Sequence, residues 1–192
     1  MTAIDTQLET TTRDLGRRLT ATGLGHSVRL RRRFDASIGD VWAAITEPAR
    51  LVAWLGTVTG DLRAGGEYRI EGNAHGPILA CRPPFHLELI WDFAGPTELD
   101  VRLAEAPEGG TLLELEHVAI IPDEYVAGVG QFASNWDFVL YLLDEYLHGT
   151  LPAQAREWTV GQNLTPEIDR LLAGSIERWT ELAAAQGYVL PV

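Results

Sequence analysis

Alternation of apolar and polar residues is the sequence feature that most constrains the fold of this chain. The clearest run is FHLELIWDF, in which every second side chain from Phe85 to Phe93 is apolar. Successive side chains of a β-strand point to opposite faces, so this run predicts a half-buried strand. The runs VRLRRRF, TVTGDL, GEYRIEG, PILACR, TELDVRLA and TLLELEHVA follow the same pattern between tight connections. Together they predict an antiparallel meander.

The apolar spacing changes to three and four residues between Phe132 and Leu147. This spacing predicts a long amphipathic helix that buries a wide face. Two short helices are expected earlier, directly after the first strand, in the stretch ASIGDVWAAITEPARLVAWLG. Ser37 precedes the first of them as a capping residue, and each carries one tryptophan, Trp42 or Trp54.

These patterns divide the chain into three parts. Residues 1–27 form a polar N-terminal arm, a marginal helix or loose segment whose only apolar stripe is Leu8, Leu15 and Leu19. Residues 28–148 hold the sheet and the long helix. Residues 149–192 form a C-terminal extension with a helix that Thr165 caps and Gly187 ends.

The helix of the extension carries an apolar stripe that needs a covering surface. Its members are Ile168, Leu171, Leu172, Ile176, Trp179 and Leu182. We expect this stripe to pack on its own domain, with packing across a two-fold axis on a second subunit as the alternative. The protein is accordingly expected to be a monomer or a homodimer.

Composition excludes several classes of partner. Acidic residues outnumber basic ones by 27 to 15, and the net charge of −12 opposes binding to nucleic acid or to anionic lipid. The alternating arginines from Arg29 to Arg33 are interpreted as the solvated face of a strand. No apolar stretch suits a signal peptide or membrane insertion, and one cysteine, Cys81, excludes an internal disulfide. A cytoplasmic protein is expected.

The order of these elements resembles a known fold. The segments RRFDASIGDVWAAITEPARLVAWLG, GDLRAGGEYRIEG, PPFHLELIWDF, GTLLELEH and NWDFVLYLLDEYL resemble the START-like SRPBCC superfamily, in its branch related to the activator of heat-shock-protein ATPase, often called polyketide-cyclase-like. The resemblance spans about Val28 to Leu147. It implies an α+β helix-grip fold, a curved antiparallel sheet wrapped around a long C-terminal helix. Because one fold hosts many activities, it does not fix a function.

A sheet curved around the long helix encloses a concavity lined by the inward phase of each strand. Such an apolar lining with few polar groups is typical of a small-molecule site. The predicted ligand-binding residues are Trp54, Tyr68, Ile70, Leu89, Trp91, Val101, Leu115, His117, Trp136, Val139, Leu140 and Leu143. Trp42 is interpreted as a structural wedge that closes one end of the sheet, and Trp54 as the better pocket candidate.

His117 stands out because it lies on the apolar phase of its strand. An imidazole there acts as an acid, a base or a ligand donor, or it is a core histidine whose hydrogen bonds are satisfied within the protein. Tyr68 and Asn135 are further hydrogen-bonding candidates. We expect no metal site and no cofactor, because the five histidines are dispersed and no GxSxG, P-loop, HExxH or dinucleotide motif occurs.

Three functions remain open from the sequence. The first is binding of a small hydrophobic molecule, a lipid or an aromatic, polyketide-like metabolite, in the concavity. The second is a cyclase- or hydrolase-like enzyme that uses His117 or Tyr68 there. The third is a protein-interaction domain comparable to the chaperone-ATPase activators.

Overall fold

The computed structural model describes residues 2–153, 155 and 164–188. Eight antiparallel strands form one sheet in the order β1-β2-β8-β7-β6-β5-β4-β3. The strands are β1 (Thr12–Leu19), β2 (Leu24–Phe34), β3 (Val58–Gly60), β4 (Glu67–Ile70), β5 (His75–Arg82), β6 (His86–Asp92), β7 (Pro96–Glu105) and β8 (Thr111–Ala119). The antiparallel meander from β3 to β8 is the one that the alternating runs predict.

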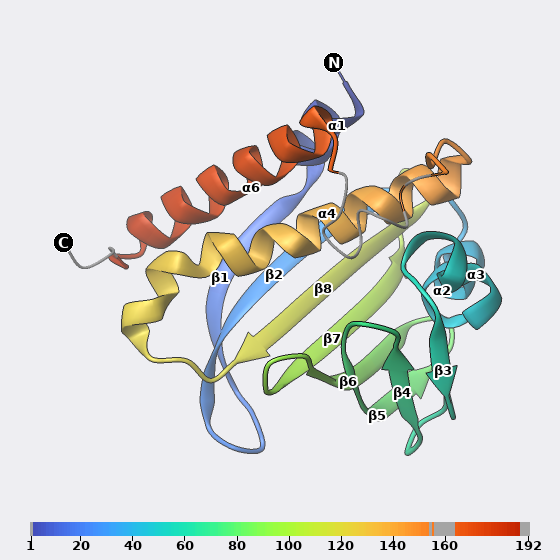
Figure 1. Cartoon of the computed structure of the whole chain (residues 1–192), viewed down its shortest axis with the longest axis horizontal. Coiled ribbons are helices and arrows are strands. Elements are labelled where there is room, and N and C mark those ends of the chain that lie inside the picture. The colour runs from blue at the N-terminus through green and yellow to red at the C-terminus, as the bar shows by residue number, and fades with distance from the viewer. Residues whose placement is uncertain (1, 154, 156–163, 189–192) are drawn as a thin grey trace.

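The described helices cover one face of this sheet. They are α1 (Ala3–Thr10), α2 (Ile38–Thr46), α3 (Pro48–Trp54), the 3-10 helix η1 (Asp123–Gly128), α4 (Val129–His148) and α6 (Pro166–Ala185). Figure 1 shows α4 running across the concave side of the curved sheet, with α2 and α3 at one end. This arrangement confirms the helix-grip fold. None of these helices is long and apolar enough to cross a membrane.

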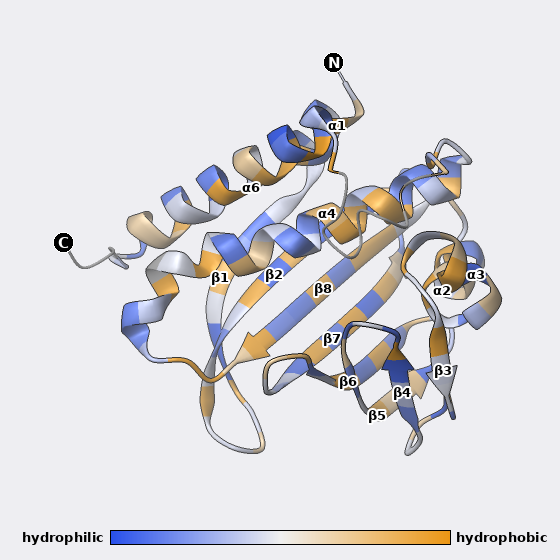
Figure 2. Ribbon diagram, in the orientation of Figure 1, coloured by the Kyte–Doolittle hydropathy of each residue, from blue (hydrophilic) through white to orange (hydrophobic). Residues whose placement is uncertain are grey.

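Side-chain alternation is visible on the strands beneath α4. In Figure 2 the residues of β7 and β8 change between hydrophobic and hydrophilic along each strand. Leu113, Leu115 and His117 are buried on the inner side of β8. On the outer side, Arg29 of β2 donates a 3.0 Å hydrogen bond to Glu116 of β8, and Arg31 pairs with Glu114. The outward arginines therefore belong to a charged convex face.

The N-terminal segment contains helix α1, one of the two forms expected for it, and also a strand that the sequence did not predict. Residues 12–19 form strand β1, which pairs with β2 along its whole length and extends the sheet. Leu15 on its inward phase is buried in the core, but the neighbouring positions of that phase are arginines with partners far along the chain: Arg13 pairs with Asp137 on α4, and Arg17 with Asp123 in η1. Because its inward phase mixes charged and apolar residues, the strand lacks the expected alternation.

The C-terminal helix α6 packs along α4 within the same chain (Figure 1). Thr165 caps it by accepting a hydrogen bond from the Ile168 amide, as its sequence indicates. Ile168, Leu171 and Trp179 are fully buried in this contact. The linker expected from Gly149 to this helix lies partly outside the described residues.

Candidate functional site

An apolar cavity lies between the sheet and helices α2, α3 and α4. Its volume is about 140 Å³, counted as space that the centre of a water molecule reaches. A cavity of this size is large enough for a molecule considerably bigger than water, which needs only about 10–15 Å³. The lining consists of Ile45, Thr46, Leu51, Trp54, Leu55, Val58, Leu62, Tyr68, Ile70, Ile78, Cys81, Leu87, Leu89, Trp91, Leu99, Val101, Leu113, Leu115, Trp136, Val139, Leu140 and Leu143.

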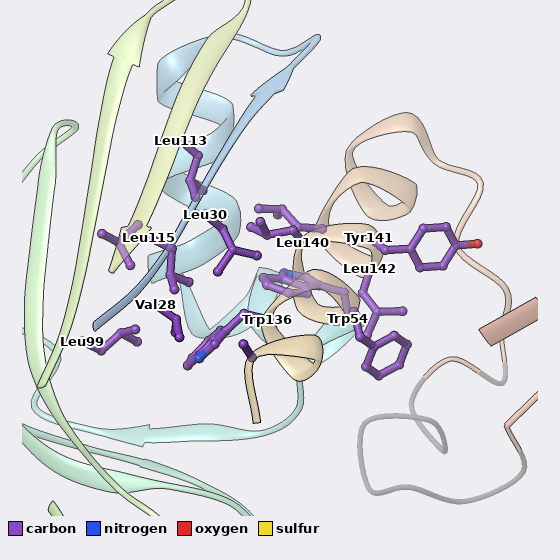
Figure 3. Packing of buried hydrophobic residues seen from close by; sticks show 14 of the residues in the cluster. Val28, Leu30, Trp54, Leu99, Leu113, Leu115, Trp136, Leu140, Tyr141 and Leu142 are labelled. Atoms are coloured by element: carbon purple, nitrogen blue, oxygen red, sulfur yellow. The ribbon is translucent and has the colours of Figure 1, made fainter. Parts of the chain in front are cut away.

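The cavity lies between the inward phases of the strands and one face of α4. Figure 3 shows Leu99 and Leu115 directed from the sheet toward Trp136 and Leu140 on the helix, while Tyr141 points away from the sheet. None of the described residues in the lining carries a charged side chain. A cavity of this kind favours an uncharged, apolar occupant, because an ion loses its hydration without gaining a partner.

Eleven of the twelve predicted ligand-binding residues line this cavity together: Trp54, Tyr68, Ile70, Leu89, Trp91, Val101, Leu115, Trp136, Val139, Leu140 and Leu143. His117 is the exception. It is buried on the concave side of the sheet but is not part of the lining. Asn135 is exposed on α4, where its side chain donates to backbone carbonyls of the same helix.

His117 is held by hydrogen bonds on both ring nitrogens. The Trp136 indole Nε1–H donates to Nδ1 at 2.9 Å, which leaves the ring proton on Nε2. Nε2 is 2.6 Å from Thr97 Oγ1, and that hydroxyl donates to the Trp91 carbonyl at 2.7 Å. Burial lowers the pKa of His117 to about 3, so the ring is neutral at ordinary pH. Its geometry is that of the satisfied core histidine.

Tyr68 crosses a glycine to reach its hydrogen-bond partner. It stands opposite Gly76 on β5, and its hydroxyl donates to the Ile90 carbonyl on β6 at 3.0 Å. A Cβ at Gly76 would lie 2.3 Å from that carbonyl oxygen, so only glycine fits there. Burial, with a smaller contribution from Asp92, raises the pKa of the Tyr68 hydroxyl. The hydroxyl therefore stays protonated and is occupied in a structural bond.

The other polar side chains of the lining are also mostly satisfied. Trp54 Nε1–H donates to the Ala44 carbonyl at 3.0 Å, and the Thr46 hydroxyl donates to the Trp42 carbonyl at 2.7 Å. Within the described part of the chain, the Trp91 indole and the Cys81 thiol are the lining groups without a hydrogen bond. Burial raises the pKa of the Cys81 thiol, which keeps it protonated.

Several lining residues were not foreseen from the sequence. Leu51 and Leu55 come from α3 and the residue after it, where only Trp54 was singled out. Leu51 lies three residues before Trp54 and four before Leu55, and this helical spacing was the available signal. Cys81 enters the lining because a register shift between Ile78 and Ala80 reverses the inward phase of β5. Trp42 is buried outside the lining, in agreement with its interpretation as a structural wedge.

The fold and the cavity define a START-like helix-grip domain of the SRPBCC superfamily. The family model "Activator of Hsp90 ATPase homolog 1-like protein" matches residues 35–148, which is more than half of the chain. The chain therefore belongs to this family. Comparison with curated proteins finds no match.

Solved structures support this assignment. The crystal structure of CalU16 from Micromonospora echinospora is 35% identical, covers 90% of this chain and 97% of that chain, and has a TM-score of 0.73. The solution structure of CalU16, also 35% identical, covers 91% and 96% with a TM-score of 0.76. The conserved protein EF2215 from Enterococcus faecalis, of unknown function, is 18% identical, covers 94% and 96%, and shares the fold at a TM-score of 0.60.

Proposed function

We propose that this protein binds a small, uncharged hydrophobic molecule, a lipid or an aromatic, polyketide-like metabolite, in the cavity between its sheet and α4. The observation that carries the proposal is the lining itself. It is apolar, it has no charged residue in the described chain, and most of its polar side chains already hold internal partners. Burial of apolar ligand surface in such a site contributes about 25 cal/mol per Å² to the free energy of binding.

Binding suits the lining better than catalysis by the candidate residues. A general acid or base must exchange a proton with its substrate. His117 lies outside the lining with both ring nitrogens engaged, and the Tyr68 hydroxyl is bonded to the Ile90 carbonyl. The cyclase- or hydrolase-like alternative therefore lacks a free proton-transfer group among these two. Binding without turnover is the proposed activity.

Cys81 provides a direct test, because it is the sole thiol of the chain and lines the cavity. We expect 1-naphthol or 1-decanol to slow the alkylation of Cys81 by iodoacetamide in the native protein. A cavity-filling variant, Leu89→Trp, should abolish this protection. Leu79→Trp is the matched control, since Leu79 is 48% exposed on β5 and lies outside the lining.

The outcome separates binding from nonspecific adsorption. Protection of Cys81 in the wild-type protein and in Leu79→Trp, but not in Leu89→Trp, supports the proposal. If neither compound protects Cys81, or if both protect Leu89→Trp equally well, the cavity is not the binding site. The same preparations, measured by native mass spectrometry, report any molecule retained from the cell and whether the chain is a monomer or a homodimer. The expected location is the cytoplasm, where the thiol stays reduced.

A further inference from the structure

A chain of hydrogen bonds behind the cavity wall joins two of its tryptophans. Trp136 on α4 donates to His117, His117 donates to Thr97, and Thr97 donates to the carbonyl of Trp91. Only the two tryptophans line the cavity, whereas His117 and Thr97 lie behind them. The chain therefore connects helix α4 to the sheet through two residues that are not part of the lining.

The tautomer of His117 gives this chain a fixed direction. An indole N–H is a donor only, so Nδ1 must be the acceptor and the ring proton must sit on Nε2. Thr97 then accepts this hydrogen bond at Oγ1, and its hydroxyl donates a hydrogen bond to the Trp91 carbonyl. Each group has a single role, so rotation of the Trp136 indole or of the His117 imidazole would leave a buried polar atom without its partner.

The indole rings of Trp136 and Trp91 lie at a steep angle to each other. The Trp91 and Trp136 rings are 5.1 Å apart between centroids and inclined by 65°. The imidazole of His117 meets Trp136 edge-on at 5.3 Å, and the Phe132 ring lies 4.7 Å from His117. Tyr68 continues the same wall, 6.4 Å from Trp91. The cavity thus presents a row of aromatic rings, in which the orientation of Trp136 is fixed by its hydrogen bond to His117.

From this geometry we propose that His117 and Thr97 are positioning residues that hold the Trp136 indole against Trp91, so that the two rings form an aromatic corner for a flat, uncharged ring system. The inference rests on the proposed binding function and deepens it, because it selects ring compounds over flexible chains. Aromatic rings gain energy from offset or edge-to-face contacts beyond the area that they bury. An acyl chain lacks this gain and adapts to a wall of any orientation.

Two probes of matched size separate ring recognition from burial alone. 1-Naphthol and 1-decanol have the same number of carbon and oxygen atoms and one hydroxyl each. We expect the wild-type protein to bind 1-naphthol more tightly, as measured by quenching of tryptophan fluorescence and by protection of Cys81. In His117→Phe, a ring of similar shape remains but Trp136 loses its acceptor. The affinity for 1-naphthol should fall about fivefold or more, and that for 1-decanol by less than about twofold.

A conservative variant tests whether the hydrogen bond is the cause. In His117→Asn, the side-chain oxygen replaces Nδ1 as the acceptor for Trp136, so part of the preference for 1-naphthol should return. Thr97→Val, which keeps the shape of the side chain, should weaken binding of 1-naphthol in the same direction as His117→Phe. This second variant keeps the test valid if the first folds poorly.

The possible results distinguish the two proposals. Equal losses for both probes in His117→Phe and Thr97→Val overturn the positioning role and leave the binding function intact. The same holds if the wild-type protein shows no preference for the ring compound. If the wild-type protein binds neither probe, the binding function itself is wrong and the positioning role fails with it.

Discussion

The two faces of helix α4 make different kinds of contact, although the residues concerned are adjacent in the sequence. Trp136 faces the cavity, while Asp137 faces α6 and β1 and is fully buried. Asp137 accepts hydrogen bonds from Arg13 with both carboxylate oxygens, from Ser175 at 2.6 Å and from Trp179 at 3.0 Å. The face that carries Asp137, called the back face here, is packed and rich in polar contacts. The face that carries Trp136, called the cavity face, is apolar and partly empty.

This difference separates the tasks of holding the helix and of receiving a ligand. A fully buried carboxylate is tolerated only where its hydrogen bonds are satisfied, and here four donated bonds satisfy it. Those bonds tie the N-terminal and C-terminal segments to the back of α4. They hold the helix without crossing the cavity, so the cavity face keeps space for another molecule. The predictions below test this separation.

The largest effect is expected at Asp137. In Asp137→Ala, the Arg13 guanidinium stays buried without its counter-charge, although it still donates to the carbonyls of Leu8 and Thr11. Breaking a buried pair in this way costs about 3–5 kcal/mol. Urea unfolding measures the loss, and Asp35→Ala, on an exposed surface pair, should change stability by less than about 0.5 kcal/mol. A loss below about 1 kcal/mol for Asp137→Ala would show that the back face does not hold the helix.

Two adjacent leucines compare the faces directly. Leu142 is fully buried outside the cavity lining, whereas Leu143 is buried within it. Truncation to alanine in a core costs about 2–5 kcal/mol, and the cost rises with the number of packed neighbours lost. We expect Leu142→Ala to destabilise the protein by about 1–2 kcal/mol more than Leu143→Ala in urea unfolding. Equal losses would mean that the cavity face is as tightly packed as the back face.

The sequence predicted the cavity face better than the back face. Trp136, Val139, Leu140 and Leu143 follow from helical spacing alone, because apolar residues at such positions point one way. The salt bridge between Arg13 and Asp137 joins residues far apart in the sequence, and no local pattern encodes it. Strand β1 was missed because Arg13 and Arg17 share its inward phase with the buried Leu15 and interrupt the apolar alternation.

Other misses have equally local physical causes. Phe85 and Phe93 lie in phase with Leu89, yet they flank β6 and are 56% and 69% exposed. Alternation predicts on which face of the sheet a side chain lies, but not where the part of that face that is covered by other residues ends. His117 also lies on the expected face of the sheet, but it is hydrogen-bonded to Trp136 and Thr97 and is not part of the lining. Those contacts depend on how α4 sits on the sheet.

Lowering the pH should reduce the stability of the protein through His117, which lies on the cavity side of α4. Its folded-state pKa of about 3 lies below the ordinary value of 6.5, so the unfolded chain binds the proton more readily. This contribution to stability is complete above pH 6.5 and is lost progressively as the pH falls toward 3. Between pH 7.5 and pH 5 the loss is about 2 kcal/mol for a group of this kind.

The comparison for this pH effect is His117→Phe. Urea unfolding of both proteins at pH 7.5 and pH 5 should show a drop in the wild type that exceeds the drop in the variant by about 2 kcal/mol. Identical pH dependence would mean that the imidazole is accessible to protons in the folded state, contrary to its burial behind Phe132 and Trp136.

The smallest effect is expected from removing one donor of the back face. Trp179→Phe keeps an aromatic ring against α4 but deletes the indole N–H that is 3.0 Å from Asp137. The carboxylate keeps Arg13 and Ser175 as donors, so the expected loss is about 1 kcal/mol, well below that of Asp137→Ala. Because the cavity is on the other side of α4, the affinity for 1-naphthol should stay unchanged within about twofold. A variant with normal stability but weakened binding would contradict the separation, since it would show that contacts on the back of the helix set the shape of the cavity.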